Sequence, residues 1–543
     1  MSDALYDAQQ AAHRDAILQV VDGKKPIDAK LLSLSDWLNP ILVKETRQAL
    51  KSRQFVATFA LTLLAVLIWT IVSISVSIPG IYYLPGGGTL LGGYFTILMV
   101  PVCVVVPMSA FRSMAAELED GTHDILSLST LSSRQVVLGK LAVAGLQAMI
   151  YFSAIVPCIA LTYLLRGVGL GTIVLIILGT AGLSILFSSL ALLFATLART
   201  RDMQVLMTVS LFLILAPTSW MWMIFIFSGV MGGEIPLEDW RLWFSIMVFF
   251  AFGLSYVWLS VLAAAAKIGF ASDNHSTRIR WMLLMQHLMY MAMAISISAW
   301  NPGEGGEIWV AFISMAAIHW AIAGSLMIGE KSVISPRTQR TLPRSSMGRM
   351  FKTWLNPGAG AGYVFCVLTF GSTVLVVLAV QSIDWNLSRN MRINVLSYTI
   401  AIACYLALYL GIARVLLMSG GKTGRPRMLL SVLTVVVLMF VCGLFPMLIS
   451  YWASGYYTVT YEPYMFTHVP WTLYEIVDGK GKADAGLIWL ILSATIVFVY
   501  NLLFAFRDVM LVRIETPKNV RDELGIKAPE AMDAPVDPLA AEG

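Results

Sequence analysis

The chain has 543 residues, of which 58% are hydrophobic and only 13% are charged. Soluble domains carry roughly a quarter charged residues, so this composition excludes an ordinary soluble domain. The net charge of +5 does not indicate nucleic-acid binding, because no basic stripe alternates with aromatic residues on a polar surface. The first 50 residues contain no apolar segment that ends in small residues, so we expect no cleaved signal peptide and a cytoplasmic N-terminus.

Long apolar runs predict an all-α integral membrane protein with about 12 transmembrane helices. The run at 55–78, for example, contains no Asp, Glu, Lys or Arg. A helix that crosses a hydrocarbon core of ~30 Å needs about 20 apolar residues. The long run that contains Pro217 predicts a kink or a partly re-entrant segment. On this criterion, spans are predicted near 55–78, 92–111, 141–165, 171–198, 203–231, 242–266, 282–300, 308–328, 361–382, 396–413, 428–451 and 485–506.

The distribution of basic residues predicts the orientation. Cytoplasmic loops of membrane proteins are enriched in Lys and Arg. With both termini inside, 31 of the 37 Lys and Arg residues fall in the cytoplasmic segments. The longest predicted outer loop, at 452–484, is rich in Trp and Tyr, which is typical of a belt at the membrane interface. We therefore predict that the N-terminus and the C-terminus are both cytoplasmic.

The sequence contains no strong signal for chemistry on this chain. Gly421, Lys422 and Thr423 match the end of a P-loop, but Leu416 stands where the first glycine is required, so no ATP site is predicted. The five cysteines lie in apolar runs without metal or redox spacing. We expect no catalytic residue, no bound cofactor and no metal on this chain.

The predicted spans contain no Asp or Glu at depth, which argues against ion-coupled transport. His287 and His319 are the histidines placed within spans, and we expect both to form hydrogen bonds across helices. The energy source for any transport is therefore expected to lie outside the bilayer.

The segment at 34–54, LSDWLNPILVKETRQALKSRQ, predicts an amphipathic helix just before the first span. Ser35 or Asp36 is placed to cap this helix, and Pro40 is typical of a first helical turn. Its basic face predicts a helix that lies in the headgroup plane. That face carries Lys44, Arg47, Lys51 and Arg53.

The segment at 112–140 is a short cytoplasmic loop with an acidic cluster. Gly121 is expected to break the preceding helix, and Ser132 or Ser133 to cap the next one. The residues between them give a short apolar face, which predicts docking on a partner. The acidic cluster comprises Glu117, Glu119, Asp120 and Asp124.

Together the two segments resemble the ABC-2 type transporter permeases. That family begins with an elbow helix of the form N-P-[IV]-[LV]-x-K-E-x-R, which is similar to NPILVKETR at 39–47. After its second span it has a Gly-Thr…Gly-Lys loop, which EDGTHDILSLSTLSSRQVVLGK at 119–140 matches except mainly for Leu131, where the family has Pro. The family also ends its fourth span with a basic turn, which LARTRD at 197–202 resembles. The resemblance covers roughly 36–270, a six-span permease unit.

The resemblance implies that the chain is the permease subunit of an ATP-driven ABC transporter. Such a subunit hydrolyses no ATP itself and takes part in the export of a cargo. A separate ATP-binding subunit, which carries the ATP and Mg²⁺, would dock on the elbow helix and the 119–140 loop. The other implied partners are a second permease unit, as a homodimer or heterodimer, and the lipid bilayer of the plasma (bacterial inner) membrane. The implied docking residues are Lys44, Glu45, Arg47, Glu117, Glu119, Asp120, Gly121, Thr122, Asp124, Arg134 and Lys140.

The chain is expected to comprise an N-terminal segment, a six-span domain, two further spans with a basic linker, a four-span region and a polar tail. WLNP occurs at 37–40 and again at 354–357, which hints at a duplicated elbow, but no second Gly-Thr…Gly-Lys loop follows. We therefore expect the second half to be a degenerate or lineage-specific extension rather than a full second permease. Two other hypotheses remain: a membrane scaffold that has kept the permease fold, and an intramembrane enzyme built on the 452–484 loop. The expected boundaries are 1–54, 55–270, 271–360, 361–507 and 508–543.

Overall fold

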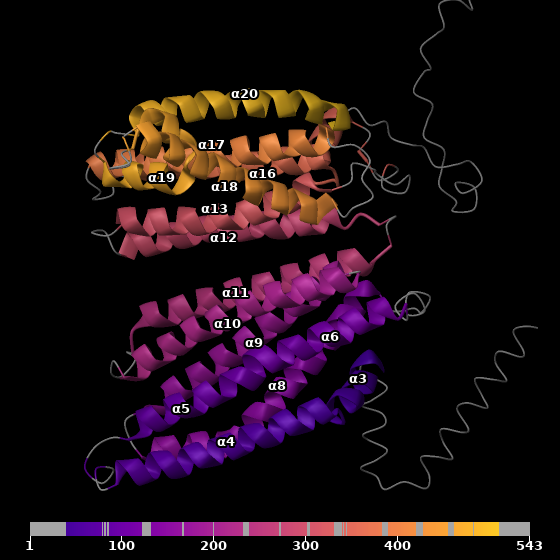
Figure 1. Ribbon diagram of the computed structural model, residues 1–543, viewed down its shortest axis with the longest axis vertical. Helices are drawn as coiled ribbons and strands as arrows, with labels where there is room; N and C mark the ends of the chain where they lie inside the picture. The colour runs from indigo at the N-terminus through magenta and orange to yellow at the C-terminus, as the bar shows by residue number, and fades with distance from the viewer. Residues whose placement is uncertain are drawn as a thin grey trace, which may run out of the picture. The chain divides into compact units, whose positions relative to one another are not determined.

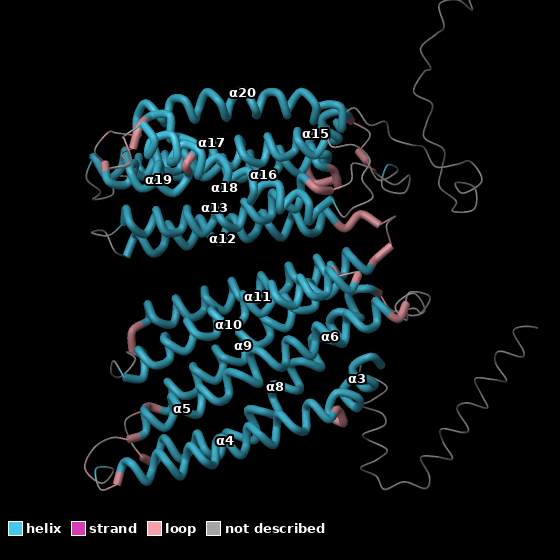
Figure 2. Tube along the Cα trace, viewed as in Figure 1, coloured by secondary structure: helices cyan, strands magenta, loops and turns pink. Residues whose placement is uncertain are grey.

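The computed structural model consists of helices, and its described residues contain no strand (Figures 1 and 2). Twelve of these helices are long and apolar enough to cross a membrane, as the sequence predicts. Apart from a few single residues between them, the described ranges are 40–78, 86–121, 132–165, 168–198, 200–231, 238–270, 273–300, 305–330, 345–382, 389–419, 427–453, 461–479 and 483–509.

The chain divides into two compact units, Met1–Gly269 and Phe270–Gly543, which we call unit 1 and unit 2. Each unit contributes six of the twelve candidate spans. The elements of unit 1 are α3 (Pro40–Leu50), α4 (Arg53–Ser77), α5 (Gly87–Met99), η2 (Val100–Val105), α6 (Val106–Glu119), α8 (Ser133–Leu164), α9 (Leu170–Leu197), α10 (Arg201–Met231) and α11 (Trp240–Ile268). Those of unit 2 are α12 (Ser276–Trp300), α13 (Gly305–Ile328), α15 (Ser346–Thr353), α16 (Ala359–Ser382), α17 (Arg389–Ser419), α18 (Arg427–Ala453), η3 (Pro463–Thr467), α19 (Val469–Asp478) and α20 (Asp484–Val509).

The elbow predicted before the first span is the helix α3, which begins at Pro40 as expected. The predicted caps Ser35 and Asp36 lie outside the described residues. A new helix starts at once, because the Ser52 side chain accepts a hydrogen bond from the backbone N–H of Phe55 at 3.2 Å. The Ser52 cap separates α3 from the span α4 and allows the two helices to take different directions.

The second span of unit 1 is one helix with a π-helical segment in its middle, formed by α5, η2 and α6. In η2 the N–H of Val106 bonds the carbonyl of Pro101, five residues back. The carbonyl of Val102 would take its partner from position 107 in the same register, but Pro107 has no N–H. Ser184 of α9 fills this gap, since its hydroxyl donates to the Val102 carbonyl at 2.7 Å. The interruption is thus tied to the neighbouring helix.

Replacing Ser184 with alanine should leave the buried Val102 carbonyl without this donor, at a cost of about 1–3 kcal/mol. The matched control is Ser189→Ala on the same helix. Ser189 is equally buried, but its hydroxyl donates at 2.7 Å to the Leu186 carbonyl of its own helix. Unfolding of the purified full chain in a detergent titration measures both variants. Equal stability of the two variants would contradict this assignment of the Ser184 bond.

The core of unit 1 forms around α9, which packs against α6, α8, α10 and α11. Its buried face includes Phe187, Ala191 and Ala195. The span α4 lies on α5 and α8 and is held by two hydroxyl contacts, Thr58 to Tyr151 at 2.6 Å and Thr70 to Tyr94 at 2.8 Å. These contacts join the first span to the second and third spans of unit 1.

The core of unit 2 forms around α17, which packs against α13, α16, α18 and α20. Tyr363 and Phe370 of α16 and Ala401 of α17 are fully buried there. The Tyr363 hydroxyl donates to the carbonyl of Ala407 at 2.8 Å, which ties α16 to the middle of α17. The short helix α15 lies between the second and third spans of this unit.

Large apolar side chains cover the outer faces of both units. Leu61, Ile71 and Val76 of α4 are 66%, 66% and 80% exposed, and Phe440 and Phe445 of α18 are 67% and 64% exposed. Leaving such surfaces in water costs ~25 cal/mol per Å² of apolar area. The exposed faces therefore indicate lipid as the surrounding medium and a multi-pass membrane protein.

Three local expectations have clear outcomes. Gly121 follows the end of α6 and has a φ of +67°, so it breaks the helix as predicted. Ser132 caps α8 and forms a reciprocal capping box with Gln135. Pro217 lies inside the continuous helix α10, so the re-entrant alternative for that span is wrong. The apolar segment between Gly121 and Ser132 lies outside the described residues.

Candidate functional site

Four polar side chains meet where α3, the end of α6 and the start of α8 come together, and we call this cluster the elbow corner. Lys140 lies at its centre and donates to Glu45, to Glu117 at 3.0 Å and to the Ser113 hydroxyl at 2.8 Å. Ser113 in turn donates to the second carboxylate oxygen of Glu45 at 3.1 Å. The elbow helix is thus bonded to both helices that flank the 120–132 connection.

The elbow corner is buried and places one ammonium group beside two carboxyl groups. The Lys140 side chain is 1% exposed, while those of Glu45 and Glu117 are 11% and 20% exposed. A cation removed from water in this way is retained only if paired and hydrogen-bonded charges surround it. The cluster therefore holds α3 rigidly against α6 and α8, and its charges are directed at one another.

A second ion pair lies beside the elbow corner on the surface. Arg201 at the start of α10 donates to Glu119 at 3.0 Å, and Gln204 donates to the other Glu119 oxygen at 3.4 Å. Arg201 is 88% exposed, so this pair contributes little to stability. An open groove of 480 Å³ between α6 and α10 adjoins it. Phe111, Ala115 and Val205 line the groove together with Arg112 and Arg201.

The structure separates the docking residues that it describes into two groups. Glu45, Glu117 and Lys140 are bonded to each other within unit 1. Thr122 and Asp124 lie outside the described residues. The exposed members include charged residues of both signs; they are Lys44, Arg47, Glu119, Asp120, Gly121 and Arg134.

Unit 2 contains a comparable buried cluster, which we call the Arg280 corner. Arg280 at the start of α12 donates to Glu330 at 2.6 Å and to the carbonyl of Trp354 at 2.5 Å. Glu330, just beyond α13, also accepts the Ser276 hydroxyl at 3.1 Å. Gly358 has a φ of +149° and directs its N–H to Glu330 at 3.2 Å.

The repeated WLNP residues contribute to the Arg280 corner. Besides the Trp354 carbonyl, the Leu355 carbonyl accepts the Thr277 hydroxyl at 3.0 Å, and the Asn356 side chain accepts an N–H of Asn274 at 3.3 Å. This second WLNP precedes the third span of its unit, whereas the first copy leads into α3 before the first span. The two copies therefore occupy different places in their units.

Two of the described histidines, His287 and His468, form hydrogen bonds that support helix packing and capping. His287 accepts the indole N–H of Trp320 at 3.1 Å, and its other nitrogen lies 3.3 Å from the Ser372 hydroxyl. The hydrogen bonds predicted across helices are thus confirmed for His287. In the segment at 461–479, His468 caps α19 and Glu475 accepts the indole N–H of Trp471 at 3.1 Å. Among the described residues, no three His, Cys, Asp or Glu side chains are grouped to hold a metal.

No family model, no curated protein and no solved structure matches this chain. The function must therefore be argued from the site. The sequence gives no sign that Glu45, Glu117 and Lys140 are paired, because a contact such as that between Glu45 and Lys140, 95 positions apart, leaves no local pattern. It also gives no sign of the role of Arg280, which it presents only as one basic residue of a loop.

Proposed function

We propose that the chain is the permease subunit of an ATP-driven transporter and that a separate ATP-binding subunit docks at the elbow corner. The observation that carries this proposal is the bonding of α3 to the ends of α6 and α8 through Lys140. A partner that pushes on this corner would move three elements together, two of which are membrane spans. The ABC-2 permease resemblance of the same segments supports this assignment.

In the proposal the two groups of polar residues have different tasks. The buried trio of Glu45, Glu117 and Lys140 transmits displacement from the elbow to the spans, because its bonds join the elements directly. The exposed residues Lys44, Arg47 and Arg134 offer charge for recognition of the partner. ATP and Mg²⁺ bind to the partner. The chain itself lies in the plasma membrane of a bacterium, and its elbow end faces the cytoplasm. The complex exports a hydrophobic or amphipathic cargo, a direction of transport that is taken from the resemblance.

A membrane scaffold with the same fold is the second candidate function. A scaffold would keep the buried trio for stability and would need no ATP-binding partner. The intramembrane enzyme has less support, since His468 and Glu475 are both engaged in holding the outer segment. The identity of the partner at the exposed residues therefore discriminates between transporter and scaffold.

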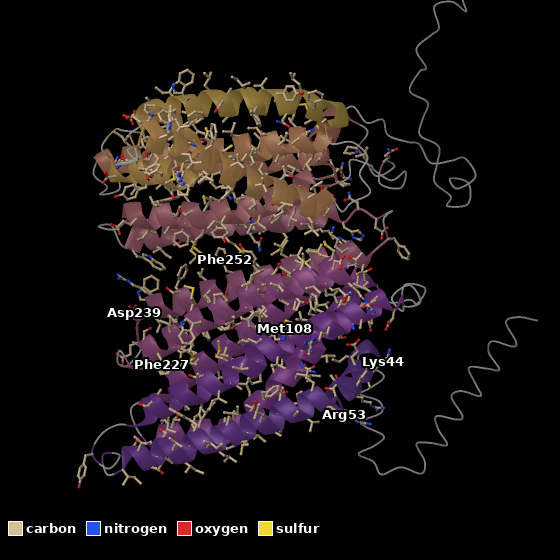
Figure 3. The ribbon with its side chains drawn as sticks, viewed as in Figure 1. Lys44, Arg53, Met108, Phe227, Asp239 and Phe252 are labelled. Atoms are coloured by element: carbon tan, nitrogen blue, oxygen red, sulfur yellow. The ribbon has the colours of Figure 1, made fainter. Side chains whose placement is uncertain are left out.

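Photo-crosslinking from the exposed residues tests the docking proposal. A photoreactive amino acid placed at Arg134 or Lys44 in the full chain, in membranes of the native host, should label a protein with a Walker-type P-loop. The matched control is Arg241, which is also exposed but lies at the start of α11, at the opposite end of unit 1 from α3. Figure 3 shows this separation through Lys44 and Asp239, the residue that caps α11.

The expected result is labelling of the ATP-binding protein from Arg134 and Lys44 and none from Arg241. Labelling of proteins without any nucleotide site from the first two positions would instead favour the scaffold. Equal labelling from all three positions would show that the elbow corner is not the docking place.

A further inference from the structure

The two units share the same pattern of helix packing when their spans are numbered in chain order. In unit 1 the spans are α4, the continuous α5–η2–α6, α8, α9, α10 and α11, and in unit 2 they are α12, α13, α16, α17, α18 and α20. In both units the first span packs on the second and third, and the second packs on the third, fourth and fifth. In both, the third packs on the fourth and sixth, and the fourth on the fifth and sixth.

This agreement extends to which helix is central. The fourth span, α9 or α17, forms the core of its unit and packs against the second, third, fifth and sixth. Each unit contains six candidate spans. Because an even number of spans returns the chain to the side on which it began, both units begin on the same side of the membrane, and the repeat is of the parallel kind. Parallel repeats of this kind occur in other transporters.

The buried clusters correspond as well. The elbow corner joins the entry to the first span, the end of the second span and the start of the third through Lys140. The Arg280 corner joins the same three places through Arg280, Glu330 and the backbone before α16. The cation comes from the third span in unit 1 and from the first span in unit 2. The two corners therefore make the same connection with different residues.

We infer that unit 2 is a second permease unit with its own docking place for an ATP-binding subunit, so that one copy of this chain binds two such subunits. The inference rests on the proposed function of unit 1. Unit 2 then takes the place of the separate second permease chain that the resemblance implies. The docking place lies at the Arg280 corner and α15, the described residues that come between the second and third spans of unit 2. Met347 of α15 is 70% exposed.

The first test is the composition of the complex, measured by native mass spectrometry of the full chain purified from its host in mild detergent. The expected assembly contains one copy of this chain and two ATP-binding subunits. Two copies of the chain with two ATP-binding subunits would overturn the inference and leave the proposed function intact. A complex without any ATP-binding subunit would overturn the proposed function itself.

The second test places a photoreactive amino acid at Met347 of the full chain. Labelling of the ATP-binding subunit from this position is expected, as from Arg134 in unit 1. The control position is Trp452, which is also 70% exposed but lies at the opposite end of unit 2, where α18 ends. Labelling from Arg134 without labelling from Met347 would confine docking to unit 1 and refute the inference alone.

Discussion

Replacing Lys140 with methionine should destabilise unit 1 by about 3–5 kcal/mol, because it leaves two carboxylates in a buried site without their cation. Lys140 is 2% exposed and bonds Glu45, Glu117 and Ser113. The elbow helix α3 should then separate from α6 and α8. Unfolding of the full chain in a detergent titration measures the loss of stability.

Two further variants make this prediction specific. Arg134→Met removes one positive charge from the same helix at an exposed position and should change stability by less than about 0.5 kcal/mol. The triple variant Lys140→Met, Glu45→Gln and Glu117→Gln removes all three charges and should recover most of the loss, since a neutral set requires no buried cation. If Lys140→Met unfolds like Arg134→Met, the elbow corner does not hold the elements together.

Replacing Arg280 with methionine should have an effect of similar size, about 3–5 kcal/mol, on unit 2. The change leaves Glu330 without its cation and removes the donor to the Trp354 carbonyl. Arg280→Lys should recover only part of the loss, because a single ammonium group cannot reproduce the planar set of donors that reaches both partners. The same detergent titration, followed by a fluorophore in unit 2, measures the change.

Arg278 supplies the matched control for Arg280. It lies two residues earlier in α12 and is exposed, so Arg278→Met should change stability by less than about 0.5 kcal/mol. A full recovery by Arg280→Lys would show that charge alone matters and would contradict the role of the backbone carbonyls. A small effect of Arg280→Met would show that the connection before α16 is held by other contacts.

Local signals in the sequence predict the spans and most of their ends. Span length and apolar composition predict the twelve helices because a bilayer demands both. Pro40, Gly121 and Ser132 mark helix ends as expected, since each acts on neighbouring backbone groups. Ser52 was not predicted, because a capping serine between the amphipathic α3 and the apolar α4 resembles any polar residue of a loop.

Features that depend on contacts between distant residues could not be predicted in this way. The π-helical segment at Val100–Val105 depends on Ser184 from another helix, although the two prolines at 101 and 107 were visible in the sequence. The elbow corner depends on the meeting of three elements. The parallel between the units depends on packing order, while the repeated WLNP residues point to positions that do not correspond.

Purification of the full-length chain from its host, with identification and quantification of every companion, tests the central claim most directly. A stoichiometric companion with a Walker-type P-loop is predicted, and its ATP turnover should fall when Lys140 is replaced by methionine but not when Arg241 is. Recovery of the chain alone, or only with companions that lack any nucleotide site, would contradict the assignment as a transporter permease.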